Sequence, residues 1–105
     1  MIEAKENQES DIVTHYGYQK DKLPFKDMTF FEESETVHNP FTGVGVKLNP
    51  VEVAVYDVTM GSYRMHLEAY ENDNNTAGKK LFQDFLKGKE WFITNNADAY
   101  YKLID

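Results

Sequence analysis

Residues 50–72 place apolar side chains on two opposite sides of a helix, and this pattern constrains the fold more than any other. At 100° per residue, one stripe has successive spacings of 3, 4, 3, 4 and 3 residues, as a heptad seam does. Its members are Val53, Tyr56, Met60, Tyr63, Leu67 and Tyr70. The second stripe consists of Val51, Val55, Val58, Met65 and Ala69. Such a helix needs cover on two sides.

The chain is short for that task, because it has 105 residues and only about 80 of them are expected to form the compact part. Burying each large apolar side chain contributes about 1.5 to 3 kcal/mol, so exposing several would forgo an amount comparable to the stability of a small domain. We therefore expect a twofold homodimer whose interface is the first stripe. The alternative is that residues 25–31 and a β-hairpin cover the second stripe within one chain.

The remaining patterns predict the other elements. Alternating apolar residues on either side of the turn at residues 39–43 predict a β-hairpin over residues 36–48. Asn49, Pro50 and Glu52 are typical of a helix start. A second helix, capped by Asn75, is expected over residues 75–95, and a short one over residues 97–103.

Charge divides the chain, because residues 1–37 carry nine acids and four lysines. We interpret residues 1–23 as an acidic flexible arm and residues 24–105 as a single compact domain. The predicted fold class is a helix-dominated α+β domain with an N-terminal extended arm, a β-hairpin, two longer helices and a short C-terminal helix.

Composition excludes several function classes. A net charge of −7 repels phosphate, which argues against direct binding of nucleic acid. The absence of cysteine excludes disulfides, thiolate zinc sites and cysteine nucleophiles. No nucleophile elbow, phosphate loop or dinucleotide fingerprint is present, so we expect no enzyme and no cofactor. Lacking an export signal or a membrane-spanning run, the chain is expected to be soluble and cytoplasmic.

Four local features have structural interpretations. His66 is expected to be a boundary residue bonded to a tyrosine rather than a catalytic imidazole. The stretch from Asp73 resembles a calcium loop only until its fifth position, which is Ala77, so no metal site is predicted. Separately, the end of the first helix is acidic through Glu68, Glu71 and Asp73. This acidic corner lies near Lys79 and Lys80. Trp91 is expected to pack under the tail helix. Lys89 beside Gly88 suggests that the second helix kinks or ends near this point.

The turn Asn39-Pro40-Phe41-Thr42-Gly43 and later residues also support a family resemblance. These are Leu48, Pro50, Val53, Ala54, Tyr56, Asp57, Gly61, Gly88, Trp91, Phe92, Asn95, Ala99, Tyr100, Leu103, Ile104 and Asp105. Over residues 38–105 the chain resembles small uncharacterised proteins encoded by marine cyanobacterial myoviruses. The resemblance implies an infected cell's cytoplasm or a virion as the setting, and it implies no activity.

The sequence thus favours a non-catalytic protein–protein interaction protein that self-associates and whose further partner is unknown. One alternative is an acidic DNA-mimic inhibitor of a host protein, against which Lys79, Lys80 and Lys87 argue. The other is a virion or assembly component.

Overall fold

The computed structural model describes residues 6–105, with side chains from residue 11 onward, and confirms a helix-dominated α+β fold. Its elements are α1 (Glu6–His15), the 3₁₀ turn η1 (Lys20–Lys22), strands β1 (Glu35–His38) and β2 (Gly45–Leu48), the long helices α2 (Pro50–Glu71) and α3 (Asn75–Asn95), the short α4 (Ala97–Ala99) and the π-helical turn η2 (Tyr100–Ile104). Both long helices and the hairpin lie where the sequence predicts them.

Helix α2 begins with a capping box. The Asn49 side chain accepts a hydrogen bond from the Glu52 backbone N–H at 2.9 Å, and Glu52 Oε1 accepts one from the Asn49 N–H at 2.9 Å. Glu52 is buried, and its Oε2 accepts a third bond from the Asn96 side-chain amide at 2.7 Å. One carboxylate therefore ties the start of α2 to the end of α3.

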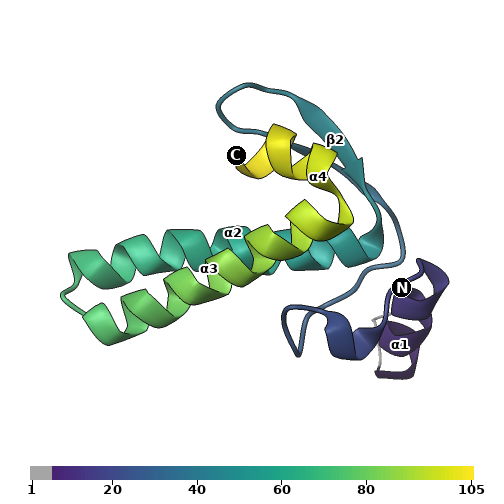
Figure 1. Ribbon diagram of the computed structural model, residues 1–105, viewed down its shortest axis with the longest axis horizontal. Coiled ribbons are helices and arrows are strands. Elements are labelled where there is room, and N and C mark those ends of the chain that lie inside the picture. The colour runs from purple at the N-terminus through teal and green to yellow at the C-terminus, as the bar shows by residue number, and fades with distance from the viewer. Residues whose placement is uncertain (1–5) are drawn as a thin grey trace.

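The β-hairpin is fastened to the C-terminus through its turn. Strands β1 and β2 are antiparallel, with Val37 paired to Val46. Asn39 Oδ1 accepts the backbone N–H of Phe41 at 2.8 Å and of Thr42 at 3.2 Å, while Asn39 Nδ2 donates to the Lys102 carbonyl at 2.9 Å. These bonds fix the turn on η2, and Figure 1 shows the hairpin and the C-terminal helix as one layer above α2.

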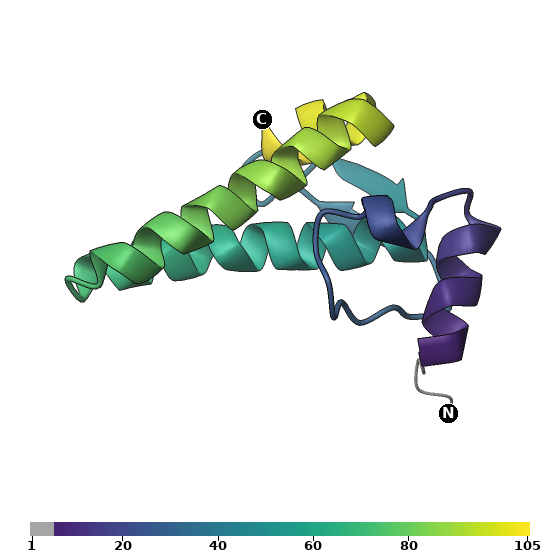
Figure 2. The same ribbon diagram turned by 60° about the horizontal axis from the view of Figure 1, so that its bottom comes forward.

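The N-terminal segment is more ordered than an extended arm. Residues 6–15 form α1, and Val13 is fully buried in the core with Met28 and Phe30. Figure 2 shows this segment in front of the start of α2, on the side away from the β-hairpin. The expected arm is thus helical over α1, because burying Val13 supplies the tertiary contact that a weakly amphipathic helix needs. Residues 1–5 of the arm lie outside the described residues.

Helices α2 and α3 pack antiparallel through small and polar side chains. On α2 the contact line contains Val55, Thr59, Ser62 and His66, all buried. A Cβ atom on Gly88 of α3 would overlap Thr59 Oγ1 and lie 2.8 Å from Thr59 Cβ. Gly88 therefore permits this close approach.

Three local expectations need correction. The cap of α3 is Asn74, whose side chain accepts the Ala77 N–H at 3.2 Å, because Asp73 takes a left-handed φ of 60° and turns the chain one residue earlier than expected. Helix α3 does not end near Lys89 but continues to Asn95, and the ammonium group of Lys89 lies 5.9 Å from the ring centroid of Tyr100. Trp91 is covered by Tyr18 of the N-terminal segment, at 5.3 Å between ring centroids, because it lies on the other side of α3 from Lys89.

We expect Gly88→Ala to lower the free energy of unfolding by about 1 to 3 kcal/mol, because the new methyl group meets Thr59. Gly61→Ala is the matched control: it also lies inside a long helix, but nothing is within 4 Å of its Cβ position. It should stabilise the protein by about 1 kcal/mol through helix propensity. Urea unfolding of both variants measures the difference, and equal shifts would contradict close packing at Gly88.

A second prediction concerns Asp57. Burial raises the pKa of its carboxyl group, the nearby Glu35 raises it further, and Arg64 opposes the change. Because a raised folded-state pKa means tighter proton binding in the folded state, Asp57 costs stability as pH rises through that pKa. Asp57→Asn should therefore be more stable than wild type at neutral pH, with the difference vanishing near pH ~4 and below. Urea unfolding across this range tests it, and a wild type more stable than Asp57→Asn at neutral pH would refute it.

Candidate functional site

The half of the α2–α3 pair nearest its connecting turn carries a contiguous group of exposed apolar side chains. We call this group the distal face. Each member is between 37% and 45% exposed. The members are Tyr63, Leu67 and Tyr70 of α2 and Phe82 and Leu86 of α3. Figure 1 shows that this end of the helix pair projects away from the rest of the molecule.

Aromatic contacts join the two helices' contributions into one surface. The ring of His66 lies 5.0 Å from that of Tyr63, 5.9 Å from Tyr70 and 5.1 Å from Phe82, between centroids. The Tyr63 ring also lies 5.0 Å from that of Phe85. Leu67 and Leu86 each follow one of these aromatic residues by four positions, so they share its side of the helix. The face therefore spans the groove between α2 and α3.

The predicted interface stripe divides into two parts. Val53 is buried, while Tyr56 and Met60 are half-buried. The Tyr56 ring packs edge-on against Phe92 at 6.3 Å, and burial raises the pKa of its hydroxyl group. The remaining members, Tyr63, Leu67 and Tyr70, stay exposed on the distal face. The protein's own chain thus covers the stripe only where α2 begins.

The sequence interpretation missed the share of α3 in this surface. Phe82, Leu86, Lys89 and Ile93 follow one another at spacings of 4, 3 and 4 residues, which is the same heptad signal as on α2. Phe82, Leu86 and Ile93 lie beside Leu81, Phe85 and Phe92, and together these residues form one broad apolar face of the helix. Their partial exposure follows from the narrow contact line between the helices, which leaves the edges of that face uncovered.

The second stripe of α2 also divides. Val51 and Val55 are fully buried, whereas Met65 is 55% exposed. Met28 and Phe30 lie in the same core as Val51. Wrapping within one chain, which the sequence left as an alternative, therefore occurs around the first half of α2 and not around its second half.

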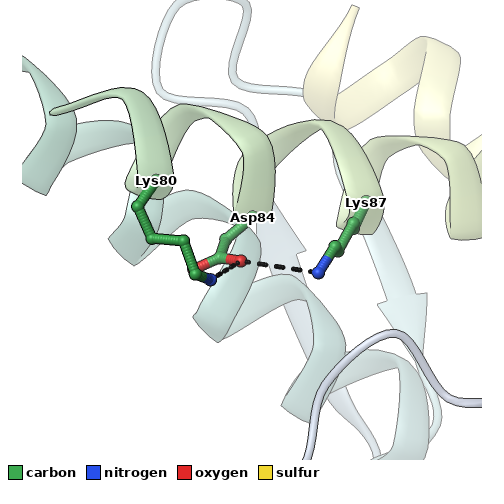
Figure 3. Close-up of polar contacts among 3 residues, drawn as sticks. All are labelled: Lys80, Asp84 and Lys87. Carbon is green, nitrogen blue, oxygen red and sulfur yellow. Dashed lines mark hydrogen bonds and ion pairs between the residues drawn. The ribbon is translucent and has the colours of Figure 1, made fainter. Parts of the chain in front are cut away.

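The opposite side of the helix pair is charged. Lys80 Nζ lies 2.7 Å from Asp84 Oδ1, and Lys87 Nζ lies 4.0 Å from the same oxygen (Figure 3). Lys80 thus pairs with Asp84 rather than with the acidic corner at the end of α2. Exposed ion pairs of this kind contribute little stability. They keep this side hydrated, and the apolar distal face is the contrasting side.

His66 is buried beneath the distal face rather than open to a substrate. It is 7% exposed, and its Nδ1 is buried without a hydrogen-bond partner in the described structure. The expected bond to a tyrosine is replaced by ring-to-ring contacts with Tyr63 and Tyr70. The structure therefore places the imidazole among aromatic rings of α2 and α3.

Among the described side chains, no three His, Cys, Asp or Glu residues form a group suited to a metal ion. The calcium-like stretch is helical from Asn75 onward, so it does not form a loop around an ion. An open depression of about 600 Å³ lies between residues 17–24 and α3, with Tyr18 and Trp91 in its wall.

Within residues 6–105, no helix combines the length and the apolar character needed to cross a bilayer. Comparison with protein-family models, with curated proteins and with solved structures finds no match to this chain.

The unpartnered nitrogen of His66 leads to a prediction. His66→Phe keeps an aromatic ring under the distal face and removes the buried polar atom, so it should raise the free energy of unfolding by about 1 kcal/mol. His66→Ala should lower it by about 2 to 4 kcal/mol, because it leaves a cavity between the rings. Urea unfolding measures both. A lower free energy of unfolding for His66→Phe than for wild type would contradict this, because the imidazole would then make a stabilising hydrogen bond.

Proposed function

We propose that this protein is a non-catalytic protein–protein interaction protein that self-associates through the distal face. The observation that supports it is the contiguous set of Tyr63, Leu67, Tyr70, Phe82 and Leu86, each partly exposed at the free end of α2 and α3. Large apolar side chains gathered on one surface favour association, because removing them from water is the main source of binding free energy.

The size of the distal face supports an interface. Side chains of this kind have about 150 to 250 Å² each, so exposed fractions near two-fifths leave about 400 Å² of apolar surface per copy. The largest apolar patches of monomeric proteins reach about 300 to 600 Å² and are often functional. Such a patch supplies about half of the roughly 800 Å² per partner of a stable complex, and the polar rim of the interface must supply the rest.

The charge distribution favours a second copy as the partner. Residues 60–95 carry five bases and five acids. The bases are Arg64, Lys79, Lys80, Lys87 and Lys89, and the acids are Glu68, Glu71, Asp73, Asp84 and Glu90. The net charge of −7 therefore resides in the rest of the chain. Two copies can meet through this neutral half with little of the repulsion that their acidic parts would cause.

The alternatives from the sequence have less support. A mimic of DNA presents negative charge without interruption, whereas α3 exposes Lys79, Lys80 and Lys87. A virion or assembly component, in the phage setting that the resemblance implies, is compatible with self-association. Competition with DNA for a host protein would favour the mimic, and incorporation into purified particles would favour the structural role. We place the protein in the cytoplasm under either form of the proposal.

A pair of charge substitutions tests self-association. Leu67→Glu puts a carboxylate in the distal face, and we expect it to raise the dimer dissociation constant about 100-fold or more, because the charge must lose its hydration in the interface. Met65→Glu introduces the same charge on the same helix outside the face, at a more exposed position, and should leave the constant unchanged.

Light scattering after size exclusion gives the molar mass, and circular dichroism shows that each variant remains folded. A wild type that stays monomeric at all concentrations would overturn the proposal. So would equal dissociation of both variants, because the distal face would then have no special role.

A further inference from the structure

The C-terminal layer, which we define as β1, β2, α4 and η2, stands on the same side of the helix pair as the distal face. Lys89 follows Leu86 by three residues on the exposed stripe of α3, and its ammonium group lies over the Tyr100 ring of η2. The Asn39 side chain then fastens the β-turn to η2. In Figure 1 this layer lies beside the half of the helix pair where α2 begins and stops before the α2–α3 turn.

The molecule is therefore L-shaped around the distal face. The long arm is the free half of α2 and α3, and the short arm is the C-terminal layer above the other half, as Figure 1 shows. A helix with its side chains is about 10 Å across, and packed helix axes lie about 8 to 10 Å apart. The C-terminal layer places a hairpin and a short helix on top of the helix pair. A second helix pair stacked on the distal face would meet this layer if it extended over the same half.

Building on the proposed self-association, we infer that the second copy docks antiparallel, with the two α2–α3 turns at opposite ends of the dimer. If both turns lay at the same end, the two C-terminal layers would face each other and occupy the same space. In the antiparallel arrangement each layer lies beyond the turn of the other copy. The α2–α3 turn of each copy then lies in the angle between the helix pair and the C-terminal layer of the partner.

The side chains agree with this arrangement. Leu67 lies nearest the middle of the distal face along α2, so a twofold axis there brings it against Leu67 of the partner subunit. The same axis brings Tyr63 toward Tyr70 of the partner subunit, which joins two aromatic residues. Arg64, at the edge, then approaches the end of the partner's α2, where Glu71 of the partner subunit carries the opposite charge.

The arrangement also accounts for Phe41, which is 95% exposed in the β-turn although two hydrogen bonds to Asn39 hold that turn rigid. Figure 1 shows the β-turn pointing along the helix pair toward its free end. In an antiparallel dimer this turn lies beside the partner's α2–α3 turn. An exposed aromatic side chain on a rigid support is the kind of group that interfaces use as an anchor.

Disulfide trapping distinguishes the two directions, and the chain suits it because it contains no cysteine of its own. A disulfide forms only where two Cα atoms come within about 7 Å. We expect Leu67→Cys to give a covalent dimer under mild oxidation at low protein concentration. Asn75→Cys, at the start of α3 next to the α2–α3 turn, and Met65→Cys, outside the face, should remain unlinked on a non-reducing gel.

Each other result has a definite meaning. A link through Asn75→Cys would overturn the antiparallel arrangement and leave self-association intact. Failure of Leu67→Cys to link, while light scattering still shows a dimer, would overturn the twofold axis at Leu67. A link through Met65→Cys alone, or a monomeric mass for the wild type, would overturn the proposed function itself.

Discussion

The close approach of α2 and α3 is the contact on which the rest of this structure depends. Thr59 and Gly88 meet where no side chain fits between the helices, and the line of small and polar residues around Thr59 sets how α2 is rotated about its axis. With that rotation fixed, the two apolar stripes of α2 lie largely on either side of this contact. Tyr56 and Tyr63 touch α3 from one edge, through Phe92 and Phe85, and most of the remaining stripe residues must find cover elsewhere.

Cover reaches only half of the helix pair. The capping box and the buried Glu52 bring the β-hairpin, the end of α3 and the C-terminal helix together around the start of α2. The N-terminal segment covers the other side there through Val13, Tyr18 and their neighbours. Beyond about Met60 the two helices pack mainly against each other within the described part of the chain, and the aromatic residues around His66 fill the space between them. The exposed distal face is a direct result of this distribution.

The self-association that we propose would explain why a chain keeps such a face. A small domain gains stability by burying its largest side chains, and five of them at the free end of α2 and α3 are left partly in water. Residues 60–95 carry no net charge in a chain that is otherwise strongly acidic, so electrostatic repulsion of a second copy is weakest at this half. In the dimer that we propose, the C-terminal layer leaves room for the antiparallel direction of approach and blocks the parallel one.

Much of this was predictable from local patterns. Asn49, Pro50 and Glu52 predicted the start of α2, and the alternation around residues 39–43 predicted the hairpin, because caps, turns and period-2 patterns depend on neighbouring residues. The exposed half of the predicted stripe, Tyr63, Leu67 and Tyr70, was likewise visible as a heptad spacing. The cap at Asn74 rather than Asn75 depends on the left-handed backbone of Asp73, which composition alone does not reveal.

The sequence by itself determined where the two long helices form, because helix propensity and capping are local. It also determined that α2 has apolar side chains on two sides, because this follows from their spacing. Only the tertiary structure decided which residues stay exposed. The fit of Gly88 against Thr59 set the rotation of α2 about its axis. The burial of Val13 made part of the expected arm a packed helix. The exposed apolar stripes of α2 and α3 came to lie on the same side of the helix pair. Such outcomes depend on contacts between residues far apart in the chain, whose relative orientation no local pattern specifies.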